Sequence, residues 1–189
     1  AAASTLTGTD QADAITGGNG NDTMSGGVGN DTFSGGAGND QMTGGTGVDS
    51  FSGGAGADSI TDFGVGGADK AVIAAGATLA AAVTTNYTAG AAGDIDNQAA
   101  AADAVFTVAN DIDFNASAAT GTTAGITITA SGNAAASTLT GTDQADAITG
   151  GDAADTLSGD AGNDTLTGGG ANDTISGGAG NDQMTGGTG

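Results

Sequence analysis

A nonapeptide repeat constrains this chain more than any other feature of its sequence. From Gly8 to Thr61 the chain divides into nonapeptides that begin at Gly8, Gly17, Gly26, Gly35, Gly44 and Gly53. A second array starts at Gly141 and continues to Gly189. Such a run has too much glycine for a helix and is too regular for a flexible linker. It predicts a solenoid in which each coil contacts only its neighbours.

Two positions of the repeat keep a constant chemical character. Position six is always aspartate: Asp13, Asp22, Asp31, Asp40, Asp49, Asp58, Asp146, Asp155, Asp164, Asp173 and Asp182. Position eight is always large and apolar: Ile15, Met24, Phe33, Met42, Phe51, Ile60, Ile148, Leu157, Leu166, Ile175 and Met184. Position eight therefore predicts a core, and position six predicts a polar site in each turn.

The residues around position eight form a minimal strand whose middle side chain points to one side. Two repeats then make one coil of turn, strand, turn and strand, and stacked coils make two parallel sheets. The predicted sheet members are Ile15, Phe33 and Phe51 in one sheet, and Met24, Met42 and Ile60 in the other. The predicted fold class is therefore all-β.

Stacking places the aspartates in columns with a neighbour about 4.8 Å away. Carboxylates at that distance repel by roughly 3 kcal/mol at an effective dielectric constant of 20. The chain has 22 acidic residues, all aspartate, against the single cationic residue Lys70. A thin core cannot offset this repulsion, so we expect the chain not to fold without cations.

The ligands on offer are oxygens, from carboxylates and from the carbonyl groups of the glycine turns. The sequence has no His and no Cys, which makes zinc and copper poor candidates. A flexible set of many oxygens favours Ca²⁺ over Mg²⁺. The repeat therefore predicts a ladder of calcium sites at the position-six aspartates.

Charge and composition also exclude several classes of function. A net charge of −21 excludes nucleic acid as a partner, because phosphate binding needs Lys and Arg. No run of 18 apolar residues is present, so we expect no membrane span. Without His, Cys or Arg the chain lacks the usual catalytic triads and phosphate clamps, and we expect no enzymatic activity.

The units GGNGNDTMS, GGVGNDTFS and GGAGNDQMT closely resemble the RTX (repeats-in-toxin) family of calcium-binding repeats. The resemblance implies a right-handed parallel β-roll that holds Ca²⁺ with the position-six aspartates and turn carbonyls. It also implies secretion through type I machinery and folding outside the cell. Several turns depart from the pattern: GTDQADAIT, which begins at Gly8 and again at Gly141, and the turns that carry Ala153, Asp160 or Ala171. The resemblance leaves the calcium affinity of those turns open.

A longer repeat organises the chain above the nonapeptides. The segment AAASTLTGTDQADAITGG occurs at 1–18 and again at 134–151, and SGGAGNDQMTGGTG occurs at 34–47 and 176–189. We predict a first β-roll at 1–61, an alanine-rich β-rich module at 62–133, and the start of a second unit at 134–189. We therefore expect the parent protein to contain a tandem array of such units.

The alanine-rich segment lacks the nine-residue period. Its runs KAVIAA, AVFTVA and GITITA predict strands, and NQAAAADA at 97–104 predicts a short helix. The run DIDFN at 111–115 resembles the start of a cation-binding loop. It lacks the Gly and Glu that such a loop needs, which favours a strand with Ile112 and Phe114 inward.

These observations favour a calcium-dependent extracellular structural protein that self-associates into a bacterial surface layer or filament. One alternative is the RTX secretion and folding region of a secreted toxin, protease or lipase. Another is a calcium-rigidified adhesin extender, in which the roll serves as a stiff spacer.

Overall fold

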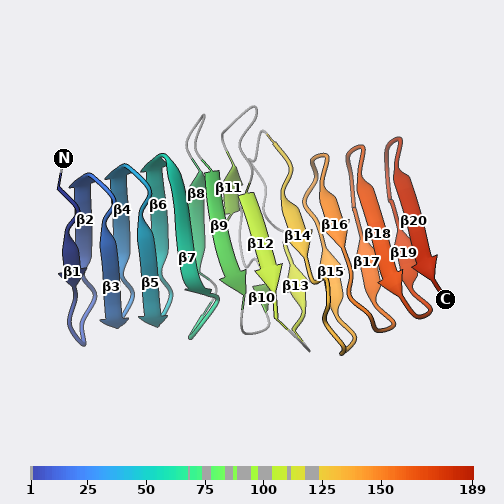
Figure 1. Ribbon diagram of the computed structural model, residues 1–189, viewed down its shortest axis with the longest axis horizontal. Coiled ribbons are helices and arrows are strands. Elements are labelled where there is room, and N and C mark those ends of the chain that lie inside the picture. The colour runs from blue at the N-terminus through green and yellow to red at the C-terminus, as the bar shows by residue number, and fades with distance from the viewer. Residues whose placement is uncertain are drawn as a thin grey trace.

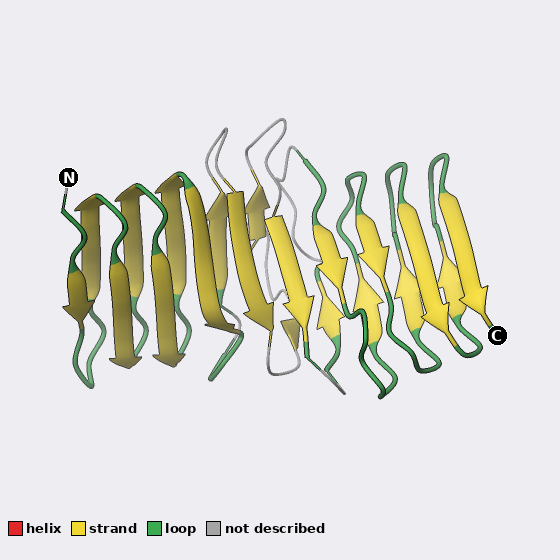
Figure 2. Cartoon of the chain, in the orientation of Figure 1, coloured by secondary structure: helices red, strands yellow, loops and turns green. Residues whose placement is uncertain are grey.

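The computed structural model describes residues 2–67, 69–73, 78–83, 87–88, 95–97, 104–109, 112–117 and 124–189. These residues form one elongated stack of strands, with the N-terminus at one end and the C-terminus at the other (Figure 1). The described part of the chain contains strands and turns and no helix (Figure 2).

One side of the stack is a single ten-stranded sheet. Its strands, in spatial order, are β1 (Thr5–Thr7), β3 (Thr23–Val28), β5 (Gln41–Thr46), β7 (Ala57–Phe63), β9 (Thr78–Val83), β12 (Ala104–Val108), β14 (Thr127–Thr129), β16 (Ala147–Thr149), β18 (Thr165–Gly170) and β20 (Gln183–Thr188).

Two five-stranded sheets lie behind it in Figure 1. The first has β2 (Ala14–Asn19), β4 (Thr32–Ala37), β6 (Ser50–Ala55), β8 (Lys70–Ile73) and β11 (Ile95–Asn97). The second has β10 (Tyr87–Thr88), β13 (Phe114–Asn115), β15 (Thr138–Thr140), β17 (Thr156–Ser158) and β19 (Thr174–Ser176).

Strand pairing follows the repeat as predicted. In one sheet Met24 pairs with Met42, and in the other Phe33 pairs with Phe51. Each pair is two nonapeptides apart, so one coil consists of two repeats. Both pairings are parallel, which confirms the all-β fold class and the parallel β-roll.

The alanine-rich segment continues the same stack. Strand β9 pairs with β7 on one side and with β12 on the other, and β12 pairs in turn with β14. Ala81 pairs with Phe106, so this coil is longer than those of the arrays. The strands predicted at KAVIAA, AVFTVA and GITITA are confirmed as β8, β12 and β14. The domain boundaries at 61 and 133 stay predictions.

Two further predictions concern this segment. Of the helix predicted at 97–104, the end residues Asn97 and Ala104 lie in β11 and β12 and are not helical. The residues between them, 98–103, lie outside the described residues, and for them the helix stays a prediction. For DIDFN, Phe114 is buried in β13, Ile112 packs against the core and Asp113 is exposed. The inward and outward directions of these three side chains are as predicted, but the strand covers only Phe114–Asn115, and Asp111 lies outside the described residues.

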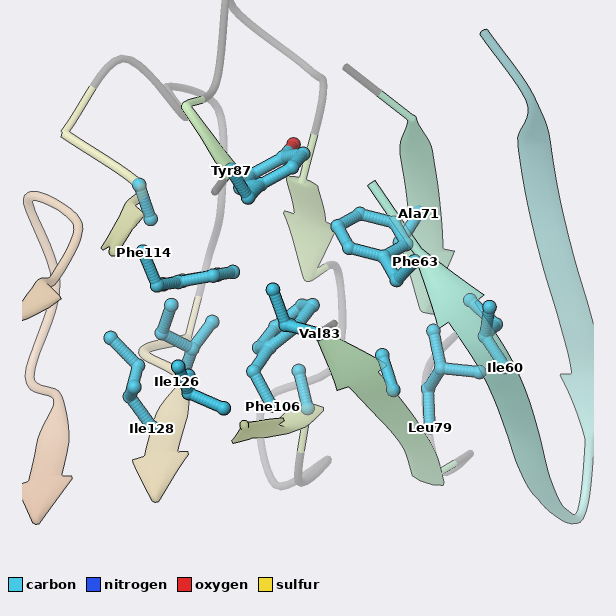
Figure 3. Packing of buried hydrophobic residues seen from close by; sticks show 14 of the residues in the cluster. Ile60, Phe63, Ala71, Leu79, Val83, Tyr87, Phe106, Phe114, Ile126 and Ile128 are labelled. Atoms are coloured by element: carbon cyan, nitrogen blue, oxygen red, sulfur yellow. The ribbon is translucent and has the colours of Figure 1, made fainter. Parts of the chain in front are cut away.

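The core differs between the arrays and the middle of the stack. In the arrays it is a single file of position-eight side chains, such as Met24 and Met42, both fully buried. In the middle it becomes an aromatic cluster (Figure 3). The ring of Phe63 lies 4.8 Å from that of Tyr87 and 5.4 Å from that of Phe106, and Phe106 lies 4.9 Å from Phe114. Aromatic pairs at these distances stabilise a core beyond their buried area.

The Tyr87 hydroxyl supplies a hydrogen bond within this cluster. It donates to the main-chain carbonyl of Asp69 at 3.0 Å, and both groups are buried. We expect Tyr87→Phe to lower the free energy of unfolding by about 1 kcal/mol, because one buried hydrogen bond is lost while the ring is kept. Chemical denaturation in calcium, followed by circular dichroism, measures this. An unchanged midpoint would contradict the role of the hydroxyl.

Candidate calcium sites

The position-six aspartates lie in the turns of the roll, and most of them are buried. Eight have 1–3% of their surface exposed: Asp22, Asp31, Asp40, Asp49, Asp58, Asp146, Asp155 and Asp164. The remaining three, Asp13, Asp173 and Asp182, are half-buried. A buried carboxylate needs compensation from hydrogen bonds or from a cation.

One carboxylate oxygen of each buried aspartate meets the main chain of the preceding coil. The N–H of Asp31 donates to Oδ1 of Asp49 at 2.8 Å, and the N–H of Asp22 donates to Oδ1 of Asp40 at 2.8 Å. The second array repeats this contact. The aspartates therefore stack in two columns, as the coil geometry predicts.

The second carboxylate oxygen is different. Among the described residues, a buried Oδ2 has no hydrogen-bond partner at Asp22, Asp31, Asp40, Asp49, Asp58, Asp164 and Asp173. A buried charged oxygen without a partner carries a large desolvation cost. The same defect at seven equivalent positions indicates a ligand at each of them.

These oxygens share a small space with main-chain carbonyls. A methyl group placed on Gly17, at position one, would lie 2.5 Å from Oδ2 of Asp22 and 2.6 Å from the carbonyl oxygen of Gly35 in the next coil. The first glycine of the repeat is therefore needed for close approach. The two oxygens that converge there are hard ligands of the kind that Ca²⁺ prefers.

The site is not a cage of carboxylates. Within the described ranges no group of three or more acidic side chains converges as a metal site. The residues that would hold calcium are thus the position-six aspartates whose Oδ2 has no hydrogen-bond partner, together with turn carbonyls. The bound ion would supply the positive charge that the columns lack, and the residues present fit it.

The electrostatics show what the columns cost without an ion. Burial raises the pKa of Asp49, Asp58 and Asp164, and the neighbouring carboxylates raise it further. Burial also raises the pKa of Asp69 to about 7 and that of Asp146 to about 6, despite hydrogen bonds from the main chain that lower both. Without a bound cation, the fold thus disfavours the ionised form of these buried aspartates.

The pH dependence of stability should therefore reverse on adding calcium. Because the pKa values of Asp69 and Asp146 are raised, the part of the metal-free fold that holds them binds more protons than the unfolded chain between about pH 4 and pH 7. In a chelator we expect higher thermal stability at pH 5.5 than at pH 7.5. In calcium we expect lower stability at pH 5.5, because the ligands must be deprotonated to bind. Thermal melts at both values measure this, and equal slopes with and without calcium would contradict it.

The structure also shows how Asp62 and Asp69, just beyond the last nonapeptide of the first array, contact the roll. Asp69 continues one column after a two-residue insertion, since its Oδ1 accepts the N–H of Asp49 at 2.9 Å. Asp62 accepts the N–H groups of Gly44 and Gly45. The run ITDF at the end of the first array contains Asp62 and is the signal that marks this exit.

Asparagines at position five form a second ladder that was missed. The side-chain oxygen of Asn21 accepts the N–H of Asn39 at 2.9 Å, and that of Asn30 accepts the N–H of Val48 at 2.9 Å. These bonds tie the exposed edges of successive turns together. The recurrence of Asn at this position is the sequence signal for them.

A parallel roll with columns of buried aspartates and unpaired oxygens defines the class of calcium-binding β-roll proteins. The RTX calcium-binding nonapeptide repeat model matches the chain four times, at residues 2–33, 25–60, 131–166 and 158–189. These matches cover well over half of the sequence, and the chain belongs to that family. Its nonapeptides are therefore calcium-binding repeats. A comparison with curated proteins gives no match.

Proposed function

We propose that this chain is part of a calcium-dependent extracellular structural protein whose tandem units assemble into a bacterial surface layer or filament. The observation that carries the proposal is the ten-stranded sheet, which runs through both arrays and the alanine-rich segment. Successive units in one chain would add strands to the same sheet and lengthen a single rod, rather than form separate domains. A rod of this kind suits a lattice or a fibre.

The role proposed is structural rather than catalytic. The sequence has no His, no Cys and no Arg, which leaves no nucleophile–base pair of the usual kinds. The described residues contain no helix long and apolar enough to cross a membrane. Membership of the RTX family and the supply of calcium outside cells support extracellular placement and secretion through type I machinery as part of this proposal.

The experiment is electron microscopy together with sedimentation velocity, in millimolar calcium and in a chelator. We expect ordered filaments or sheets in calcium and none in the chelator. Magnesium at the same concentration serves as the control, because it fits an all-oxygen flexible site poorly. Rods that stay monomeric in calcium would contradict assembly and would favour the adhesin extender.

A further inference from the structure

The eleven RTX turns fall into two groups by the backbone at position two. In eight turns this residue has a positive φ between 69° and 112°: Gly18, Gly27, Gly36, Gly45, Gly54, Asp160, Gly169 and Gly178. In the other three it does not: Thr9, Thr142 and Gly151. The difference follows the sequence only in part, because Gly151 is free to adopt a positive φ, whereas Asp160 adopts one at a cost.

In the three turns without a positive φ, the N–H group at position two donates a hydrogen bond to Oδ2 of the aspartate in the same turn. We call these turns closed, and we call a turn open when its Oδ2 has no such partner. The N–H of Thr142 donates to Oδ2 of Asp146 at 2.6 Å, and the N–H of Gly151 donates to Oδ2 of Asp155 at 2.6 Å. The first repeat of the chain has the same bond, from the N–H of Thr9 to Oδ2 of Asp13 at 2.6 Å.

The threonine hydroxyls strengthen two of these closures. The hydroxyl of Thr9 donates to Oδ2 of Asp13 at 2.9 Å, and that of Thr142 lies 3.1 Å from Oδ2 of Asp146. In the turns with a positive φ this oxygen is the one without a partner, at seven of eight aspartates. The peptide orientation at position two thus decides whether the oxygen meets an N–H group or remains open.

We propose that Asp13, Asp146 and Asp155 do not bind calcium and that their turns close without metal. A main-chain N–H pointing at the carboxylate satisfies the oxygen that a cation would otherwise take. It also places a positive partial charge where a cation would approach. Among the RTX turns, calcium binding is therefore confined to those whose Oδ2 is open, from Asp22 to Asp58 and from Asp164 onward.

The turn that follows the first array, at Asp69, is also closed by main-chain hydrogen bonds. Oδ1 of Asp69 accepts the N–H of Asp49 at 2.9 Å, and its Oδ2 accepts the N–H of Gly64 at 2.7 Å. Both oxygens of this buried carboxylate are satisfied by the main chain. The part of the stack from Asp69 to Asp155 is then bounded at both ends by turns that need no ion.

This central block also holds three of the four rings of the aromatic cluster. The ring of Phe114 lies 5.2 Å from that of Tyr87 and 4.9 Å from that of Phe106, and the fourth ring, that of Phe63, packs against Tyr87 and Phe106 from just outside the block. The block thus has a better core than the arrays and no open calcium turn among its described residues. It stays folded without calcium and presents preformed strand edges on which the two arrays fold when calcium binds. This inference is independent of assembly into a lattice.

A matched pair of variants tests the calcium assignment. Asp155 and Asp164 are both buried, both accept a main-chain N–H at Oδ1, and differ in the partner of Oδ2. Native mass spectrometry and calorimetric calcium titration should show fewer bound ions and at least about tenfold weaker affinity for Asp164→Asn. Asp155→Asn should bind as many ions as the unchanged chain. A comparable loss of ions in Asp155→Asn would overturn the proposal.

Hydrogen exchange on the unchanged chain tests the block without any variant. In a chelator the amides of Thr142 and Gly151 should stay protected, while the amides of Asp22 and Asp31 should exchange freely. In calcium all four should be protected. If Thr142 and Gly151 lose protection in the chelator together with Asp22 and Asp31, the central block does not fold alone and the proposal is wrong. This readout does not depend on whether Asp164→Asn folds.

Discussion

Removing calcium is expected to unfold the parts of the two arrays that hold the open turns, at 17–62 and from 159 onward, and millimolar calcium is expected to refold them. Seven buried carboxylate oxygens have no partner in these arrays, and the stacked carboxylates repel one another. A cation in each open turn would coordinate the unpaired oxygen and neutralise the repulsion between carboxylates. Calcium binding and folding of these turns are therefore coupled.

Far-UV circular dichroism in a chelator and in calcium measures this change. We expect the β-signal of the arrays to disappear on chelation and to return with calcium, and magnesium to restore much less of it. The remaining signal should come from the central block. A spectrum unchanged by chelation would contradict the calcium ladder as a whole.

Asp40→Ala is expected to weaken calcium-dependent folding strongly. Asp40 is 2% exposed, and its Oδ1 accepts the N–H of Asp22 at 2.8 Å. Its own N–H donates to Oδ1 of Asp58 at 2.9 Å. The substitution removes an oxygen ligand and leaves the buried N–H of Asp22 unpaired. A hydrogen bond to a charged group contributes about 1.5–3 kcal/mol, so the calcium midpoint should rise by about tenfold to a hundredfold.

The matched control is Asp10→Ala, which removes an exposed carboxylate at position three of a closed turn. It lowers the negative charge by the same amount without touching a column. Calcium titration followed by circular dichroism compares the two variants. Coincident titration curves would show that general charge, rather than the position-six column, governs calcium binding.

Much of the roll could be predicted from the sequence because its period repeats without interruption. Each nonapeptide places one apolar residue on one face, so Met24 and Phe33 had to enter different sheets. Period and side-chain direction are local properties of the chain. The same reasoning placed the position-six aspartates in columns, since every coil within an array has the same length.

The alanine-rich segment could not be predicted so closely. It has no constant period, and its coils vary in length, as the pairing of Ala81 with Phe106 shows. Alanine has the highest intrinsic helix propensity of all residues and is depleted in strands, which is why a helix was expected at 97–104. The two described ends of that range are strands because their neighbours in the stack are strands.

The sequence alone determined that this chain forms an acidic all-oxygen ladder on a thin apolar core, because both properties repeat residue by residue. Only the tertiary structure decided which turns are open to calcium. Whether a turn is open depends on the orientation of single peptide groups, at Gly151 and Asp160 above all. These orientations are set by contacts with the coils stacked on either side. Composition predicts the opposite backbone at both positions, since glycine favours a positive φ more readily than aspartate does.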